Sequence, residues 1–261
     1  MNAFEDLRKS INSSKNQEVT VIGETIIDNY FFVTPVGVTS KDPAISLLEK
    51  NNKKIAGGAL AVAKTLASFY KKVNFYTYGN QRYLQKEIKR YKNIKLNNLS
   101  RQLKIQTKNR YLGANRFEKL FQTTSFKENK INKKNKNLMI NSIKNIKSKN
   151  LIICDYGIDL FNDKIVKIIN SKKCNKFINV QTNSLNYGFN LFKKYQNYKY
   201  LSLDEKEWSL GLNIPNVKIK DVSNYAKKNK KKIFAFTMGK SGSAIFSNNR
   251  TNFSESLIDK V

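Results

Sequence analysis

Phe234-Ala-Phe-Thr-Met-Gly-Lys-Ser-Gly-Ser-Ala-Ile-Phe246 joins two apolar runs through a turn that contains two glycines. The first run leads into Thr237-x-Gly239-x-x-Gly242, and the second run leaves it. A strand, a glycine turn and a second strand bring the backbone close to a bulky charged ligand, because glycine has no side chain to keep the ligand away. The stretch therefore predicts one wall of a nucleotide site.

Upstream of this stretch, apolar strand-like runs alternate with helix-like segments. Residues 1–17 are polar and are expected to form a loosely attached leader. Repeated alternation of strands and helices is typical of a mostly parallel sheet covered on both faces. Strands are predicted at 18–23, 73–79, 151–157, 176–180, 198–203 and 232–238, and helices at 55–70, 80–92, 130–148, 159–171 and 217–230.

Carboxylates and glycines stand where such a sheet binds its ligands. Asp28 comes just past the first strand, and Asp155 ends the strand that begins at Leu151. Ligands of open α/β sheets gather at the carboxyl ends of the strands. The pair Gly57-Gly58 opens an apolar helix, whose free N–H groups favour negative charge. Close packing of this helix against a strand explains the glycine pair equally well.

Two segments are predicted to form strands outside the main sheet. Residues 29–49 contain short aromatic and β-branched runs, broken by Pro35, Gly37 and Pro43. Residues 104–124 contain two strand-like runs that flank Gly113-Ala-Asn115 and predict a β-hairpin. We expect the two segments to pair and to form a lid over the ligand edge.

The charge is strongly basic, with 49 Lys and Arg residues against 19 Asp and Glu residues and a formal net charge of +30. That balance taken alone suggests nucleic acid as a partner. However, the lysines are scattered along the chain, and no helix-turn-helix, zinc-finger or RNP-type motif accompanies them. Nucleic-acid binding is therefore the less favoured interpretation.

Histidine is absent and the two cysteines, Cys154 and Cys174, have no metal-binding spacing. Imidazole catalysis and His-ligated metal sites are thereby excluded, so proton transfer would fall to carboxylates, lysine or tyrosine. The sequence shows no signal peptide and no stretch long enough to cross a bilayer, so we expect no membrane partner and a cytoplasmic location.

The order and spacing of several motifs resemble those of the PfkB/ribokinase family of carbohydrate kinases, in particular the branch close to bacterial heptose-phosphate kinases. The resemblance covers about residues 18 to 261. It implies a ribokinase-like three-layer α/β/α fold with a mostly parallel central sheet and a small β lid. The motifs are Val21-Ile-Gly-Glu-Thr-Ile-Ile-Asp28, Gly57-Gly58, Arg116-Phe-Glu-Lys-Leu-Phe121, Cys154-Asp-Tyr-Gly157, Val180-Gln-Thr-Asn-Ser184, Gly188-Phe-Asn190 and Thr237-Met-Gly-Lys-Ser-Gly242.

On the substrate side, the resemblance implies that Asp28 accepts hydrogen bonds from sugar hydroxyls, with both carboxylate oxygens available as acceptors. Gly57 and Gly58 would lie along the sugar. Arg116 in the lid hairpin would meet a phosphate or sugar oxygens, and Asp155 would also face the substrate.

On the nucleotide side, Thr237, Gly239 and Gly242 would border the phosphates and ribose of ATP. The family's Asn-x-x-Glu element organises magnesium and phosphates through water, and it stands here as the more acidic Asp204-x-x-Glu207. Glu207 would thus act on Mg²⁺ through water. From the residues alone, the carboxylates of this segment also suit the N-terminal dipole of a helix.

Two departures from the family pattern matter. Ala61 stands where the family usually has an asparagine. The family's Asp-x-x-Gly-Ala-Gly-Asp segment, which carries the anion hole and the catalytic base, is matched only by Asp259-Lys260-Val261. Residues 1–261 are therefore expected to form one ribokinase-like domain that is incomplete at its C-terminal end, with little or no kinase activity and with apolar sheet surface left open.

The leading hypothesis is an ATP-dependent kinase that transfers a phosphoryl group to a hydroxyl of a sugar or sugar phosphate, with Mg²⁺ bridging the ATP phosphates. A non-catalytic sugar- or nucleotide-binding module is the second hypothesis, and a nucleic-acid-binding protein is the third. By resemblance, the lid strands could also pair between two subunits of a homodimer.

Overall fold

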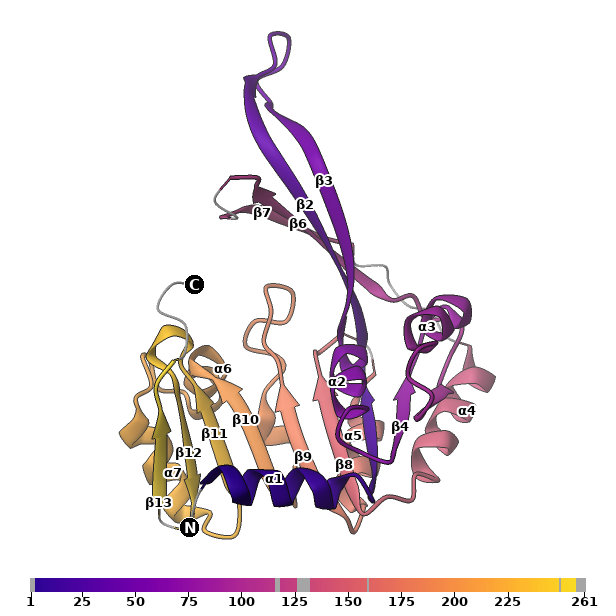
Figure 1. The fold of residues 1–261 in the computed structure, drawn as a ribbon, viewed down its shortest axis with the longest axis vertical. Helices are drawn as coiled ribbons and strands as arrows, with labels where there is room; N and C mark the ends of the chain where they lie inside the picture. The colour runs from indigo at the N-terminus through magenta and orange to yellow at the C-terminus, as the bar shows by residue number, and fades with distance from the viewer. Residues whose placement is uncertain (1–2, 116–117, 126–131, 159, 249, 257–261) are drawn as a thin grey trace.

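The structure is a computed structural model that describes residues 3–115, 118–125, 132–158, 160–248 and 250–256 (Figure 1). Within these residues the main sheet has nine strands in the order β13-β12-β11-β10-β9-β8-β1-β4-β5. Their bounds are β1 Glu18–Gly23, β4 Lys72–Thr77, β5 Ile94–Asn98, β8 Asn150–Asp155, β9 Asn175–Val180, β10 Tyr200–Asp204, β11 Ile233–Thr237, β12 Ser243–Ser247 and β13 Arg250–Ser254.

The main sheet is mostly parallel, as the alternation of strands and helices predicts. Every neighbouring pair from β11 to β5 is parallel, and only β12 and β13 join antiparallel. Neither β5 nor β13 was predicted from the sequence. β13 is polar and exposed along its whole length, so it lacks the apolar pattern that marks the other strands.

Helices pack on both faces of this sheet and divide the core in two. Val19 and Val21 of β1 pack with α2 (Ala59–Leu66) and α3 (Gln81–Ile88), whereas Ile22 points to the other face. The core cluster on that other face includes residues of four further helices. These are α4 (Lys133–Lys144), α5 (Asp163–Ser171), α6 (Glu205–Leu212) and α7 (Ile219–Lys228).

The face that carries α2 and α3 is covered unevenly. The buried cluster on this face draws its strand residues from β1, β3, β4, β5 and β8. Farther along the sheet, the rings of Phe177 in β9 and Tyr200 in β10 lie next to each other, with their centroids 6.2 Å apart, and both residues are only half-buried. Ile245 of β12 is 42% exposed. Apolar sheet surface is therefore left partly open here among the described residues.

The predicted leader is more ordered than expected. Its residues form the helix α1 (Ala3–Ser14), which lies across the lower front of the sheet in Figure 1. The Ser14 hydroxyl donates to the Phe69 carbonyl at 2.9 Å, and the Lys71 N–H donates to the Gln17 carbonyl at 2.9 Å. The C-terminal end of α1 is thus fastened, while most of its described side chains are exposed.

A second sheet, here called the lid sheet, has the strand order β3-β2-β6-β7 and rises above the main sheet in Figure 1. It consists of β2 (Thr25–Val38), β3 (Ile45–Gly58), β6 (Gln106–Gly113) and β7 (Lys119–Ser125). The hairpin predicted within residues 104–124 is confirmed as β6 and β7.

The expected short, broken strands at 29–49 are wrong, because β2 and β3 each run for 14 residues. Pro35 and Gly37 do not end β2, since the pairing with β3 shifts register between them and leaves an irregularity that tolerates both residues. The helix predicted from Ile55 begins only at Ala59, because residues 55–58 pair with β2.

Some lysines contribute to the fold as helix caps. Lys176 is fully buried, and its ammonium group donates to the carbonyls of Ile169, Asn170 and Lys172 at 3.3, 3.1 and 2.8 Å, at the C-terminal end of α5. A cation at this end of a helix is favoured by the helix dipole. Lys172 donates in the same way to the carbonyl of Lys144, the last residue of α4, and to that of Ile146.

We expect Lys176→Met to lower the free energy of unfolding by about 1–3 kcal/mol, because it leaves buried carbonyl groups without their donor. Lys173→Met is the matched control, since Lys173 is exposed and lies in the connection between α5 and β9, just before Lys176. Urea denaturation of both variants measures the difference. Equal stability of the two variants would show that Lys176 does not hold the end of α5.

Candidate functional site

Three predicted site residues end parallel strands at one edge of the main sheet. Asp155 is the last residue of β8, Asp204 the last of β10 and Thr237 the last of β11. Asp204 and Thr237 are direct partners in the register of β10 and β11. The fold thus brings these positions to the edge where open α/β sheets bind ligands.

On the lid sheet, Asp28 is paired with Arg110. Arg110 Nε and Nη2 lie 3.0 and 2.9 Å from Asp28 Oδ1, and Arg110 Nη1 donates to Gln122 Oε1 at 3.0 Å. Asp28 lies opposite Lys108 in the pairing of β2 with β6. Successive side chains of a strand point to opposite faces of the sheet, so Lys108 and Arg110 both lie on the face that carries Asp28. Burial, followed by the nearby Arg110 charge, lowers the pKa of Lys108.

The glycine pair at the end of β3 makes room for neighbouring groups. A Cβ atom on Gly57 would lie 2.4 Å from Asp28 Oδ2, so a side chain at this position would push the carboxylate aside. Gly58 has a φ of +61°, and a Cβ atom there would lie 2.5 Å from the carbonyl oxygen of Glu24. The geometry therefore shows the close packing that the sequence left as one explanation, and it places Gly57 directly against Asp28.

Asp155 has no exposed surface. Its Oδ1 accepts from the Gly157 N–H at 2.8 Å and from Asn190 Nδ2 at 3.1 Å. Its Oδ2 accepts from the Tyr195 hydroxyl at 2.7 Å and is ion-paired with Lys194 at 2.6 Å. All of these partners belong to the protein, so Asp155 lies behind the ligand edge and holds the connections on either side of it.

Glu24, which follows β1, is a second fully buried carboxylate at this edge. It accepts from the N–H groups of Tyr156 and Leu160 at 2.9 and 3.2 Å. Burial, followed by repulsion from Asp155, raises the pKa of Glu24 to about 8. Glu24 and Asp155 therefore fix the start of the connection that follows β8.

At the start of α6, Asp204 and Glu207 form a capping box. The Glu207 N–H donates to Asp204 Oδ1 at 2.8 Å, and the Asp204 N–H donates to Glu207 Oε2 at 2.8 Å. Glu207 Oε1 also accepts from the Thr182 N–H at 3.1 Å. Burial raises the pKa of Glu207 to about 7. These carboxylates lie at the N-terminal end of a helix, as the residues alone suggest, and the capping box between them is an additional feature. Glu207 also ties the connection after β9 to α6.

The described residues contain no group of three or more His, Cys, Asp and Glu side chains that could by itself hold a metal ion. Mg²⁺ does not need such a group, because it is usually bound by one or two carboxylates together with phosphate oxygens and water. The exposed Asp204 carboxylate beside Glu207 meets that requirement.

The glycine turn between β11 and β12 has the backbone shape that the sequence predicts. Gly239 and Gly242 have φ values of +54° and +84°, and the Met238 N–H donates to the Gly242 carbonyl at 2.9 Å. A Cβ atom on Gly239 would meet no heavy atom within 4 Å, whereas one on Gly242 would lie 2.1 Å from the Ser254 carbonyl oxygen. The backbone at Gly239 is thus open to a ligand, and Gly242 is required by packing.

Arg116, the lid residue predicted to meet substrate, lies outside the described residues, as do residues 259–261. Sequence reasoning missed Arg110 and Tyr156. Burial, and then the charges of Cys154, Glu24, Asp28 and Glu207, raise the pKa of Tyr156. The sequence shows that Lys108 and Arg110 alternate along one strand, but only the pairing of β2 with β6 places Arg110 beside Asp28.

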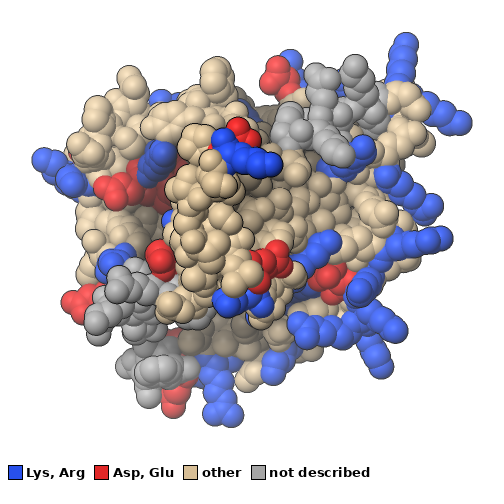
Figure 2. Space-filling view, turned by 90° about the horizontal axis from the view of Figure 1, so that it is seen from above, with Lys and Arg blue, Asp and Glu red and all other residues tan. Residues whose placement is uncertain are grey.

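The basic charge does not converge on the ligand edge. Figure 2 shows Lys and Arg side chains spread around the margin of the face seen from above, with acidic side chains among them. This distribution differs from the continuous basic patch of a nucleic-acid interface. No helix among the described residues is long and apolar enough to span a membrane.

The fold is similar to that of solved structures of sugar kinases. Phosphofructokinase-2 from Escherichia coli in complex with fructose-6-phosphate matches with a TM-score of 0.68 and 12% identity, over 91% of this chain and 79% of that chain. A "putative ribokinase" from Agrobacterium tumefaciens matches with a TM-score of 0.62 and 10% identity, over 93% and 78%. No protein-family model and no curated protein matches the sequence. The chain has the ribokinase-like α/β fold, as predicted.

The buried Glu24 predicts a pH dependence of stability. In the unfolded chain its pKa is near 4.5 and in the folded chain about 8, so between these values the folded state retains a proton that the unfolded state has released. This contribution is fully present below the unfolded pKa and is lost as the pH rises through 8, with a slope of at most about 1.4 kcal/mol per pH unit.

Glu24→Gln is therefore expected to flatten the decline in the free energy of unfolding between pH 5 and 8. Glu18→Gln, at the exposed start of β1, is expected to leave that decline in place. Urea denaturation across this pH range measures both slopes. A slope unchanged by Glu24→Gln would contradict the assignment.

Proposed function

We propose that this chain carries the binding walls of an ATP-dependent carbohydrate kinase that acts on a sugar phosphate of the heptose-phosphate kind. The observation that carries the proposal is the ion pair between Asp28 and Arg110 on the lid sheet. It is joined by the glycine turn after β11, whose backbone is open at Gly239. The two parts suit the two substrates of such a reaction, a polyhydroxylated acceptor and a nucleotide.

On the acceptor side, Asp28 would accept hydrogen bonds from sugar hydroxyls, beside a backbone kept free of side chains at Gly57 and Gly58. Lys108 and Arg110 supply two cations on the same face, which favours an acceptor that already carries a phosphate. Arg116 remains a predicted further contact. We assign Asp155 the role of positioning Tyr156, because its carboxylate is enclosed by protein donors.

On the nucleotide side, the backbone of Thr237, Gly239 and Gly242 would border the phosphates and ribose of ATP. Asp204 and Glu207 would hold Mg²⁺ and its water molecules against the phosphates. When bound, Mg²⁺ would neutralise the negative charge of the phosphates and orient the terminal one. We propose that the described residues provide the contacts that bind both substrates.

We expect the two walls to be separable by mutation. Asp28→Asn should weaken binding of a sugar phosphate about 10- to 100-fold, because it removes charge-assisted hydrogen bonds, while ATP·Mg²⁺ binding stays unchanged. Gly239→Ala should weaken ATP·Mg²⁺ binding and leave sugar-phosphate binding unchanged. Its added methyl group would occupy space that the protein leaves empty and that the nucleotide would fill. Isothermal titration calorimetry measures both affinities.

Gly188→Ala is the matched control for Gly239→Ala. Gly188 also has a positive φ, of +79°, and open space around its Cβ position, so it imposes similar backbone strain away from the nucleotide wall. Loss of ATP binding in both variants would point to strain and not to a ligand contact. Absence of ATP and sugar-phosphate binding in the unmodified chain would overturn the proposal, and binding without transfer in a longer chain would favour a binding module.

We also propose that two copies pair through the lid sheet. The hairpin formed by β2 and β3 exposes Val38 and Ile45 at its turn end. The two residues are opposite each other in the β2–β3 register and are 66% and 75% exposed. Halfway along β2, Tyr111 stacks between Phe31 and Phe121 at ring-centroid separations of 4.9 and 4.3 Å. Apolar surface of this kind is stabilised when a second subunit covers it.

Ile45→Asp is expected to convert a dimer into a monomer in sedimentation velocity experiments, because it places a charge in the apolar contact. Ser46→Asp places the same charge on the opposite face of the strand and should leave the dimer intact. A monomer in the unmodified chain at high concentration would exclude pairing through the lid sheet.

A further inference from the structure

An open pocket of about 320 Å³ lies beside the ligand edge and includes none of the predicted site residues. One wall comes from the connection that follows β8, with Ile158 and Phe161. The other comes from the connection between β9 and β10, with Phe189 and Lys194. This volume is within the range of sites that bind small organic molecules. We call it the α5 pocket, because Asn162 at the start of α5 also lines it.

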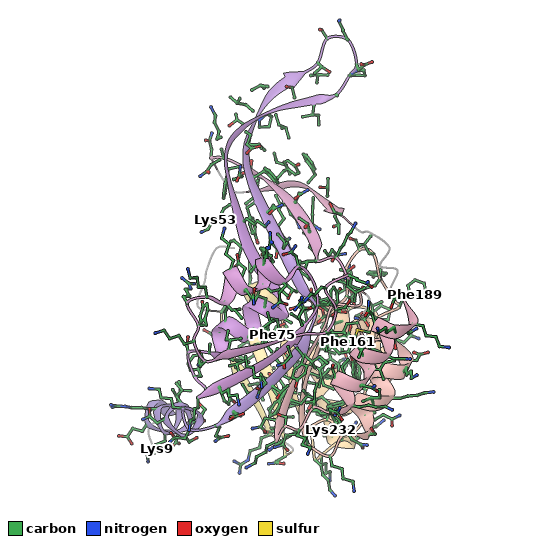
Figure 3. The ribbon with its side chains drawn as sticks, turned by 90° about the vertical axis from the view of Figure 1, so that its right-hand side faces the viewer. Lys9, Lys53, Phe75, Phe161, Phe189 and Lys232 are labelled. Carbon is green, nitrogen blue, oxygen red and sulfur yellow. The ribbon has the colours of Figure 1, made fainter. Side chains whose placement is uncertain are left out.

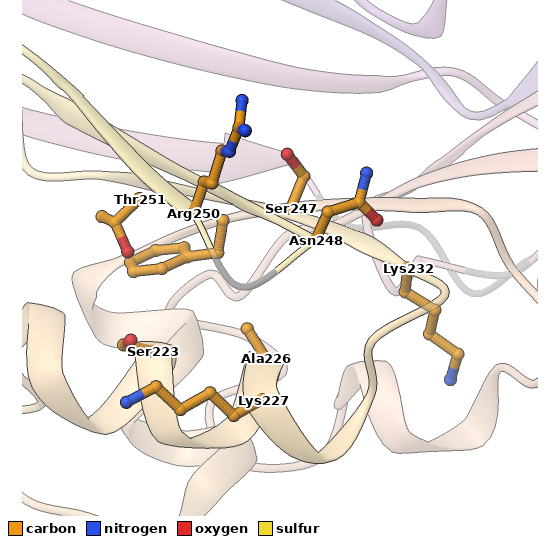
Figure 4. Close-up of a pocket in the computed structure, with 9 residues that line it drawn as sticks. Ser223, Ala226, Lys227, Lys232, Ser247, Asn248, Arg250 and Thr251 are labelled. Carbon is orange, nitrogen blue, oxygen red and sulfur yellow. The ribbon is translucent and has the colours of Figure 1, made fainter.

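A second hollow, between α7 and the β12–β13 hairpin, is a weaker candidate. It is surrounded by Lys227, Lys232 and Arg250, but its volume is only about 10 Å³, which is room for a single water molecule at most. In Figure 4 these three side chains point in different directions and do not converge. This hollow is therefore not a ligand site.

Two aromatic rings give the α5 pocket an apolar character. Phe161 is 8% exposed, and Phe189 is 91% exposed at the outer edge of the molecule, on the opposite side from Lys9 of α1 in Figure 3. Phe189 is held on an ordered turn, since its N–H donates to the Asn186 carbonyl at 3.0 Å and Asn186 Nδ2 donates to the Tyr156 carbonyl at 2.9 Å. The backbone of this turn is therefore held in place, with the exposed Phe189 ring beside the pocket.

Lys194 gives the α5 pocket its charge. Its ammonium group lies 2.6 Å from Asp155 Oδ2 and 2.6 Å from Asn190 Oδ1. An ammonium group has three N–H donors, so one remains for a ligand. Among the described residues that line the pocket, Lys194 is the charged one and none is acidic. Because Asp155 already compensates much of this charge, a ligand would need an apolar body as well as an anionic group.

We infer that the α5 pocket binds a small organic anion, with a flat apolar body against Phe161 and Phe189 and a carboxylate or phosphate at Lys194 and Asn162. The pocket is separate from the proposed kinase walls, and the inference does not depend on them. The same Lys194 holds Asp155, which fastens the connection after β8. A ligand in the pocket would therefore act on the residues that position Tyr156.

The test uses benzoate and phenyl phosphate as probes, with benzamide and inorganic phosphate as controls, in calorimetric titrations of the whole chain without nucleotide. We expect at least one of the two aromatic anions to bind about tenfold more tightly than either control, since only the anions combine both required features. Benzoate against phenyl phosphate decides between a carboxylate and a phosphate ligand. No binding of either anion at about 10 mM would overturn the inference.

Two variants locate the binding. Phe189→Ala should weaken binding of the aromatic anion about tenfold, and Leu185→Ala, on the same turn and also exposed but outside the pocket lining, should not. Asn162→Asp keeps a good helix cap and adds a negative charge at the rim, so it should abolish anion binding with the protein still folded. Unchanged affinity in Phe189→Ala or in Asn162→Asp would contradict the assignment.

Discussion

Two carboxylates without any exposed surface, Glu24 and Asp155, set the conditions for the ligand edge of this protein. A buried carboxylate is costly unless donors inside the protein satisfy it. The donors come from the connections that follow β8 and β9, through the N–H groups of Tyr156 and Leu160 and through side chains such as Asn190. These connections are consequently fixed at the edge where Asp204 and Thr237 also end their strands.

The lid sheet completes the other side of the site. Gly57 lets the Asp28 carboxylate lie directly against the backbone of β3, and Arg110 orients that carboxylate from β6. The pair joins two strands that are about 80 residues apart in the sequence. The proposed acceptor site thus depends on the register of the lid sheet, and the proposed nucleotide site depends on the main sheet.

The sequence was informative wherever one local pattern determines the structure. Alternating apolar runs predicted the parallel strands, and the glycines of the Thr237 to Gly242 turn predicted its shape. It was uninformative where register or burial decides. Arg110 could be chosen as the partner of Asp28 only once β2 and β6 were paired. The length of β2 was hidden because Pro35 and Gly37 end most strands but are tolerated at an irregularity. The enclosure of Asp155 depends on side chains from distant segments.

We propose that the glycine turn and the lid sheet are two walls of one substrate site. Hydrogen–deuterium exchange with a non-hydrolysable ATP analogue, Mg²⁺ and a sugar phosphate tests this proposal. We expect the nucleotide to slow exchange at residues 237–242 and the sugar phosphate to slow exchange at residues 106–112. Both ligands together should protect each region more than either alone. Protection confined to other parts of the chain, or no change with either ligand, would contradict it.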